Sequence, residues 1–126
     1  MSNKYKVTKR KRGLYIQYLG KLSIEDALKG QAAFHGSENF DDQSYVIWDY
    51  RGCDISEITE ADVDMLVAHH IGATHTLKIH KVAAVGEGPR FKMLFEHFKA
   101  RCEDSGSPWE ICMFSSDEEA MKWCRD

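Results

Sequence analysis

The segment Tyr45-Val46-Ile47-Trp48-Asp49-Tyr50-Arg51 decides the fold. Its aromatic and β-branched residues follow one another almost without a break, which is typical of a strand buried on both faces of a parallel sheet. A turn comes next, and Thr59 then caps a helix whose apolar residues recur at the helical period and which ends near Gly72–Thr76. The sequence therefore predicts a central strand at Tyr45–Arg51 that leads directly into a helix.

Two further segments repeat this strand-to-helix pattern. Lys81–Gly86 is a run of small apolar residues, and Gly88-Pro89 opens the helix after it, because proline suits the first helical position. Trp109–Phe114 is the next strand, and Ser116-Asp117-Glu118-Glu119 forms a capping box that opens a short final helix. Parallel neighbouring strands require crossovers of this kind, so we expect the three strands to be parallel.

The N-terminal part of the chain completes the predicted sheet. Tyr5–Val7 and Leu14–Leu19 have strand composition, and Lys9–Gly13 between them predicts a β-hairpin with a basic tip. Ser23 then caps a helix that ends near Gly36. The predicted order is β-β-α-β-α-β-α-β-α, an α/β fold with a five-stranded mixed, mostly parallel sheet and helices on both faces.

The length and charge of the chain limit the classes of function that it can have. A chain of 126 residues, 43% hydrophobic and 29% charged, is expected to form a single domain over 1–126. Six of its seventeen Lys and Arg residues lie in the first twelve positions, which leaves eleven positive against twenty negative charges in the rest. That acidic body argues against a nucleic-acid surface. The basic run itself either keeps a sheet edge soluble or meets an anionic partner.

The chain also lacks targeting and cross-linking signals. No run approaches the ~18 apolar residues of a membrane span, and the first residues lack a secretory stretch, so we expect a cytoplasmic protein. The four cysteines form no CxxC pair, which predicts reduced, mostly buried thiols. His69, His70, His75 and His80 have no i, i+4 pair on one helix face. We therefore expect no metal site and no cofactor.

The element order and the ending Phe114-Ser115-Ser116-Asp117-Glu118-Glu119-Ala120-Met121-Lys122-Trp123 resemble known proteins. The order resembles the SpoIIAA-like fold of anti-sigma-factor antagonists and STAS domains. The ending is similar to that of uncharacterised bacterial SpoIIAA-like (STAS/SEC14-type) proteins. The antagonist resemblance implies a partner-binding regulator phosphorylated on a serine before the second helix, where Ser56 is the nearest candidate. Its neighbours Glu57 and Glu60 would oppose an added phosphate. The SEC14-type branch implies binding of an apolar or lipid-like molecule.

The residues themselves suggest three candidate functional sites. Cys53 lies in the turn before a helix, where thiol pKa values fall, so it is the cysteine expected to react and the candidate nucleophile of a weak hydrolase. Arg51 and Arg90 follow neighbouring strands and could converge on an anionic ligand near Thr59. Met65 and Met93 adjoin the apolar stripes of their helices, where they either widen the core or form a docking surface.

These observations favour a non-enzymatic binding or regulatory domain that contacts a protein partner or a second copy of the chain. The alternatives are a carrier of a small apolar ligand and the weak hydrolase. The candidate ligand or partner surface consists of Arg51, Cys53, Asp54, Ser56, Thr59, Met65, Gly88, Arg90 and Met93.

Overall fold

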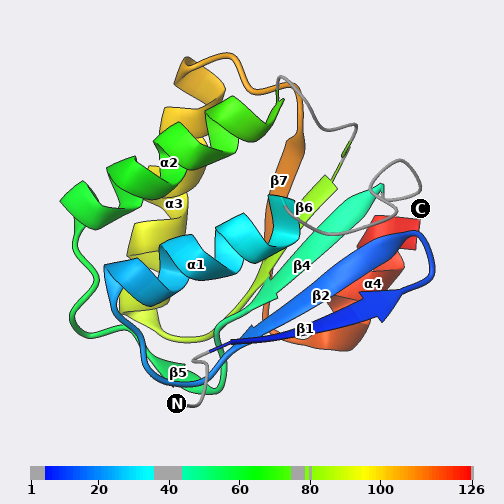
Figure 1. Ribbon diagram of the computed structural model, residues 1–126, viewed down its shortest axis with the longest axis horizontal. Coiled ribbons are helices and arrows are strands. Elements are labelled where there is room, and N and C mark those ends of the chain that lie inside the picture. Colours follow the sequence, from blue (N-terminus) through cyan, green and yellow to red (C-terminus); the bar gives the residue numbers. More distant parts are fainter. Residues whose placement is uncertain (1–4, 36–43, 75–78, 80, 126) are drawn as a thin grey trace.

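The computed structural model of the protein describes residues 5–35, 44–74, 79 and 81–125. Its strands are β1 (Tyr5–Arg10), β2 (Gly13–Tyr18), β3 (Gly20–Lys21), β4 (Tyr45–Asp49), β5 (Cys53–Asp54), β6 (Lys81–Val85) and β7 (Glu110–Phe114). Its helices are α1 (Ile24–His35), α2 (Glu60–Thr74), α3 (Pro89–Asp104) and α4 (Asp117–Arg125). Figure 1 shows the central sheet with helices packed against it.

The main sheet has five strands in the order β1-β2-β4-β6-β7. β1 pairs antiparallel with β2, and every other neighbouring pair is parallel. β4 lies at the centre, where Trp48 stands opposite Ile16 on one side and Ala84 on the other. All five residues of β4 are buried. The predicted sheet and its mostly parallel pairing are confirmed.

The central strand is two residues shorter than predicted. Tyr50 still donates its backbone N–H to Val85 O at 2.8 Å, but Cys53 N–H turns back to Tyr50 O at 3.2 Å. The chain therefore reverses at Arg51 and Gly52 instead of continuing the strand. It then pairs β5 with β3 in a small second sheet that the sequence did not predict. Two-residue strands carry no detectable alternation, so sequence pattern gives no signal for them.

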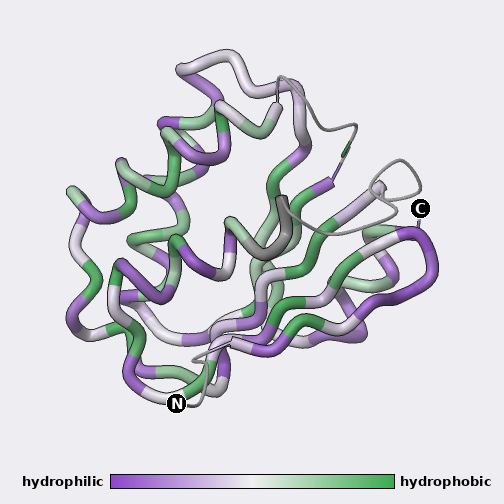
Figure 2. Tube along the Cα trace, in the orientation of Figure 1, coloured by the Kyte–Doolittle hydropathy of each residue, from purple (hydrophilic) through white to green (hydrophobic). Residues whose placement is uncertain are grey.

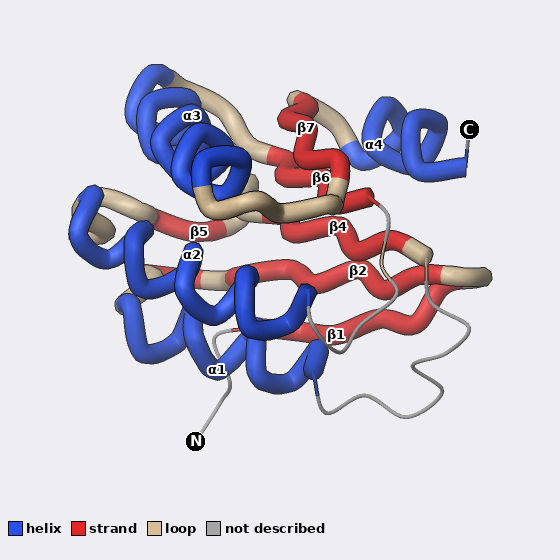
Figure 3. The backbone as a smooth tube through the Cα atoms, turned by 90° about the horizontal axis from the view of Figure 1, so that it is seen from above, coloured by secondary structure: helices blue, strands red, loops and turns tan. Residues whose placement is uncertain are grey.

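Helices cover both faces of the sheet unequally, with α1, α2 and α3 on one face and α4 on the other (Figure 3). Alternate residues of each strand divide between the two faces because side chains in a strand point to opposite sides. Val46 and Trp48 belong to the larger core under α1–α3, whereas Tyr45 and Ile47 belong to the smaller core under α4. The prediction of helices on both faces is confirmed.

Three predicted helix caps are present. Ser23 Oγ accepts from Asp26 N–H at 3.1 Å at the start of α1. Thr59 and Asp62 form a reciprocal pair at the start of α2, and Ser116 Oγ accepts from Glu119 N–H at 3.2 Å before α4. Each cap satisfies a backbone N–H that has no partner within the helix, which is worth about 1 kcal/mol.

The basic hairpin tip is smaller than predicted. β1 extends to Arg10, so only Lys11 and Arg12 form the turn, and Arg12 has a φ of 63°. Figure 2 shows the hydrophilic colouring of this turn. Arg10 is not free to meet an anion, because its guanidinium forms two hydrogen bonds of 2.8 Å with the Asp117 carboxylate. This ion pair ties the hairpin to the N-terminus of α4.

Candidate functional site

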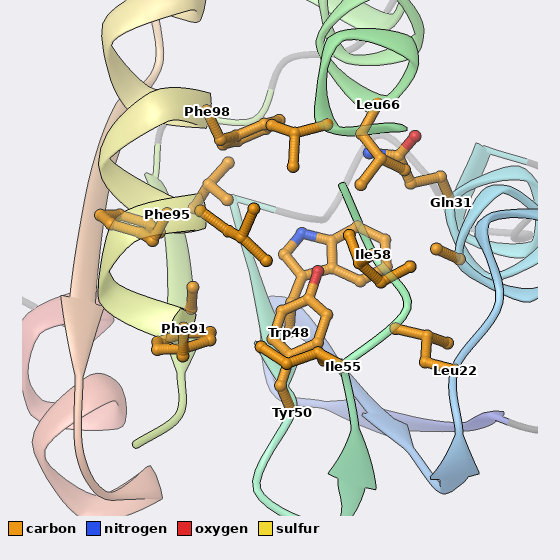
Figure 4. A pocket seen from close by; sticks show the side chains of 15 residues that line it. Leu22, Gln31, Trp48, Tyr50, Ile55, Ile58, Leu66, Phe91, Phe95 and Phe98 are labelled. Atoms are coloured by element: carbon orange, nitrogen blue, oxygen red, sulfur yellow. The ribbon is translucent and has the colours of Figure 1, made fainter. Parts of the chain in front are cut away.

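An apolar cavity lies between the sheet and the three helices on its larger face. It has a volume of about 80 Å³ and is not sealed from solvent. Figure 4 shows the side chains that point into it from β4, α1, α2 and α3. The lining residues are Leu22, Ala27, Gln31, Trp48, Tyr50, Ile55, Ile58, Val63, Leu66, Val82, Ala84, Phe91, Leu94, Phe95 and Phe98. None of them carries a charge.

The cavity exists because small and large side chains meet without filling the space between them. Ala84 on β6 is the register neighbour of Trp48 on β4, and both face α1–α3. The short alanine side chain leaves room above the sheet that the rings of Phe91 and Phe95 on α3 do not occupy completely. Voids of this size are few in a packed interior, and each forfeits contacts that a filled core would make.

Gln31 on α1 brings a carboxamide into this apolar space. The side chain is only 9% exposed, and its Oε1 is buried without a hydrogen-bond partner. Figure 4 shows the carboxamide extending from α1 toward Leu66 of α2. A buried acceptor that lacks a donor costs about 1–3 kcal/mol. Nearly all buried polar side chains are paired, so this exception needs an explanation.

Besides Gln31 and the indole of Trp48, Tyr50 brings a polar group to the cavity. Its ring stacks on Tyr18 at a centroid distance of 5.1 Å and meets Phe91 at 5.6 Å. Figure 4 shows its hydroxyl pointing into the cavity. Burial raises the pKa of Tyr50 above its usual value, so the hydroxyl stays protonated and can donate.

The backbone turn at Ile55–Ile58 forms one wall, and Arg90 fastens it. Arg90 Nε donates to Ile55 O at 3.2 Å, and Nη2 donates to Ile58 O. The side chains of both isoleucines line the cavity. Arg90 thus donates its hydrogen bonds to backbone carbonyl groups of the protein. These contacts give it a structural role in the turn and do not support the predicted role in binding an anion.

Arg51 likewise has a partner within the protein, because it forms an ion pair with the buried carboxylate of Asp49. Its Nη2 lies 2.8 Å from Asp49 Oδ2 and its Nε lies 3.1 Å from Oδ1. Tyr15 also donates its hydroxyl to Asp49. Burial raises the pKa of Asp49, but the hydrogen bonds from Arg51 and Tyr15 outweigh it and leave the pKa below its usual value. Arg51 and Arg90 therefore have separate partners within the protein, and their convergence on one anion near Thr59 stays a prediction.

Cys53 does not have the chemistry expected of it. It is half-buried in β5, and its thiol donates to Tyr50 O at 3.3 Å. Burial, together with the carboxylates of Asp49 and Asp54, raises the pKa of Cys53 to about 12. The prediction of a lowered thiol pKa is wrong, because the N-terminus of α2 begins seven residues later in the chain.

The loop before α2 is shaped by its own side chains. Asp54 Oδ1 accepts from Ser56 N–H at 2.8 Å, and this hydrogen bond lowers the pKa of Asp54. Ser56 is exposed near the start of α2, which agrees with its predicted position. Thr59 is occupied as the helix cap. Phosphorylation of Ser56 stays a prediction.

Met65 on α2 and Met93 on α3 lie at the surface. Their exposed fractions are 48% and 46%. The interpretation that they widen the core is therefore wrong. Gly88 lies at the start of α3 with a φ of 91°, a conformation that glycine adopts without strain, and its carbonyl accepts from Lys92 N–H. Gly88 thus has a backbone role.

The histidines are distributed over structural contacts. His70 is buried and lies 2.8 Å from Ser107 Oγ, with the rings of Phe98 and Trp109 edge-on to it. His75 and His80 lie outside the described residues. Sequence reasoning missed His97 of α3, which contacts two carboxylates of α2. Its Nδ1 lies 3.3 Å from Glu60 Oε2, and its Nε2 lies 2.8 Å from Asp64 Oδ1. Within the described ranges, no group of three or more His, Cys, Asp or Glu side chains is arranged to hold a metal ion.

Sequence reasoning also missed Gln31 and Tyr50 as residues that bring polar groups to the cavity. By its spacing in the sequence, Gln31 falls on the same helix face as Ala27 and Leu28. An amide on such a face is a signal, but whether it has a partner depends on tertiary packing. Tyr50 was treated as part of a buried strand, and nothing in the sequence distinguishes a paired hydroxyl from an unpaired one.

Comparisons with known proteins bear on the fold. No family model matches the sequence, and no curated protein matches it. Among solved structures, the chain is similar to an uncharacterized protein from the DUF3478 family with a SpoIIAA-like fold from Shewanella loihica PV-4. The two are 18% identical with a TM-score of 0.55, and the match covers 95% of this chain and 91% of the other. The protein therefore has a SpoIIAA-like fold, and at this identity the likeness extends to the fold alone.

In the part of the chain that the structure describes, no helix is long and apolar enough to cross a membrane.

Proposed function

We propose that this protein binds a small apolar molecule in the cavity beneath α1–α3 and serves as a non-enzymatic carrier or sensor of it. The observation that carries the proposal is Gln31, whose side chain lines a mostly apolar cavity and whose Oε1 is buried without a hydrogen-bond partner. Ligand sites have this composition, with apolar walls and a few polar groups that orient the ligand. A bound molecule would give Gln31 the donor that the protein does not supply.

The size of the cavity limits the ligand. About 80 Å³ is roughly half of the ~150 Å³ of an engineered apolar cavity that takes up benzene or xenon. A short branched alkyl group therefore fits inside, whereas a six-membered ring enters only in part, through the open side of the cavity, or completely when the helices move apart. A complete acyl chain does not fit in this space.

The hydrolase alternative loses support on chemical grounds. The nucleophile of a thiol hydrolase is the thiolate, and a Cys53 pKa of about 12 leaves very little thiolate at neutral pH. The hydrogen bond from Cys53 to Tyr50 O gives the thiol a structural role beside the cavity. The raised pKa of Cys53 thus favours the proposed binding function over covalent catalysis by this thiol.

Native mass spectrometry of protein purified without organic solvent tests the proposal. Ala84→Leu places a larger side chain in the cavity, because Ala84 is a lining residue on the buried face of β6. Ala100→Leu makes the same change at an exposed position of α3 and is the matched control. We expect an adduct of constant mass on the wild type and on Ala100→Leu, and none on Ala84→Leu. An adduct that survives in Ala84→Leu would contradict binding in the cavity.

A second candidate function is docking of a protein partner or another copy of the chain on α2 and α3. The exposure of Met65 and Met93 favours it, since adaptable methionines are frequent at docking surfaces. The two helices also line the cavity, so both candidate functions involve the same elements.

A further inference from the structure

We infer that the cavity selects neutral molecules that join a small apolar body to a hydrogen-bond donor, with Gln31 Oε1 as the acceptor. This inference rests on the proposed function and specifies the chemical class of the ligand. It excludes two neighbouring classes, namely purely apolar molecules and molecules whose polar group is ionised.

The absence of charge in the cavity wall excludes an ionised ligand. The fifteen lining residues include no Asp, Glu, Lys, Arg or His. A carboxylate or ammonium group moved from water into such a space would have no counter-charge, and an isolated buried charge is far more costly than a buried neutral group. Arg90 does not change this, because its guanidinium is directed to the carbonyl oxygens of Ile55 and Ile58.

The state of Gln31 favours a donor-bearing ligand over a purely apolar one. A hydrocarbon in the cavity would leave Oε1 unpaired and would also exclude water from it. A hydroxyl or N–H group on the ligand removes that penalty, and a net hydrogen bond strengthens binding by about threefold to tenfold. Tyr50 offers a second polar contact, because its protonated hydroxyl both donates and accepts.

The two groups differ in how strictly they require a partner. Gln31 Oε1 is buried and unpaired, whereas the Tyr50 hydroxyl is not among the fully buried unpaired atoms of the described residues. Gln31 is therefore the group that determines the preference for a donor. Tyr50 serves as the matched comparison within the same cavity.

Three probes of similar size separate the classes: phenol, benzene and benzoate. Each is titrated into the full chain while the backbone amide signals of lining residues such as Ala84 and Leu94 are followed by NMR. The proteins are the wild type, Gln31→Leu and Tyr50→Phe. Gln31→Leu is expected to fold, because it replaces an unpaired buried amide by an apolar group of similar size.

In the wild type, phenol should bind about threefold to tenfold more tightly than benzene, and benzoate should not shift the lining signals. In Gln31→Leu the order should reverse, because the phenol hydroxyl then loses its acceptor while benzene gains an apolar contact. Tyr50→Phe should keep the preference for phenol.

Two results would overturn the inference and leave the proposed function in place: benzene binding as tightly as phenol to the wild type, or a phenol preference that survives in Gln31→Leu. Binding of benzoate to the cavity would overturn the exclusion of ionised ligands. If none of the probes shifts the lining signals, the proposed function fails together with the inference.

Discussion

Arg90 at the start of α3 donates a hydrogen bond from Nη2 to the backbone carbonyl of Ile58, the residue before the Thr59 cap of α2. The same guanidinium reaches Ile55 O, so one side chain fixes both ends of the turn that forms a wall of the cavity. Hydrogen bonds from a charged donor are stronger than neutral ones. Arg90 therefore has a definite role in shaping the cavity, although not the anion-binding role that its position in the sequence indicated.

Replacing Arg90 by Met should remove both hydrogen bonds and lower the free energy of unfolding by about 1 kcal/mol, a value kept small because the residue is exposed. Arg90→Lys should lose less, since an ammonium group can still donate to one carbonyl. Urea unfolding measures the difference. Arg101→Met is the control, because Arg101 is exposed and its contact with Asp64 is long, with 3.8 Å between Arg101 Nε and Asp64 Oδ1. Equal losses at the two positions would contradict a specific role for Arg90.

Asp49 should make stability fall at acidic pH. Its pKa is lower in the folded protein than its ordinary value of 3.8, so its contribution is complete above that value and is lost as the pH falls through the folded pKa. Asp49→Asn should reduce the free energy of unfolding by about 2 kcal/mol at pH 7 and flatten its pH dependence below pH 4.

Urea unfolding between pH 7 and pH 2.5 measures this dependence. Asp104→Asn at the end of α3 is the control, because Asp104 is exposed. An unchanged acid dependence in Asp49→Asn would show that Arg51 and Tyr15 do not stabilise the charged form of this carboxyl group.

Cys53 should be slow to react with iodoacetamide. With a pKa of about 12, about one molecule in ten thousand carries the thiolate at pH 8. Peptide mass spectrometry should find labelling of Cys53 at least about a hundredfold slower in the native protein than in urea. Rapid native labelling at pH 8 would restore the reactive thiol that the sequence predicted.

Met65→Gln and Met93→Gln should each change the free energy of unfolding by less than about 0.5 kcal/mol, because both side chains are about half exposed. If the docking function holds, the double variant should also shift the oligomeric state or lose a partner, as light scattering after gel filtration would report. Leu94→Gln on α3 is the comparison, since Leu94 is buried and its loss should cost about 2 kcal/mol or more. A similar loss for either methionine would contradict its surface position.

The parts of the fold that depend on local sequence were predictable. Ser23, Thr59 and Ser116 each cap a helix through a partner three residues away, so both members of each pair are visible in the sequence. Strand composition and strand-to-helix alternation identified the five-stranded sheet for the same reason. The small β3–β5 sheet was missed, because its residues lie more than thirty positions apart and show no pattern.

The candidate site was harder to predict, because it depends on which groups lack partners. Asp49 and Arg51 have opposite charges and are two residues apart, so their pairing could have been inferred from the sequence. The carbonyl groups that engage Arg90 belong to a turn whose path no residue type determines. Gln31 is distinguished only by the donors that tertiary packing fails to bring near it.

The most direct test of the apolar cavity is a crystal structure of the protein under xenon pressure, because apolar cavities take up xenon without needing a polar contact. The cavity predicts a xenon atom in van der Waals contact with Trp48, Ile58 and Phe95, and its loss in Ala84→Leu. A wild-type crystal with no xenon among these side chains would contradict an accessible cavity and, with it, the proposed binding function.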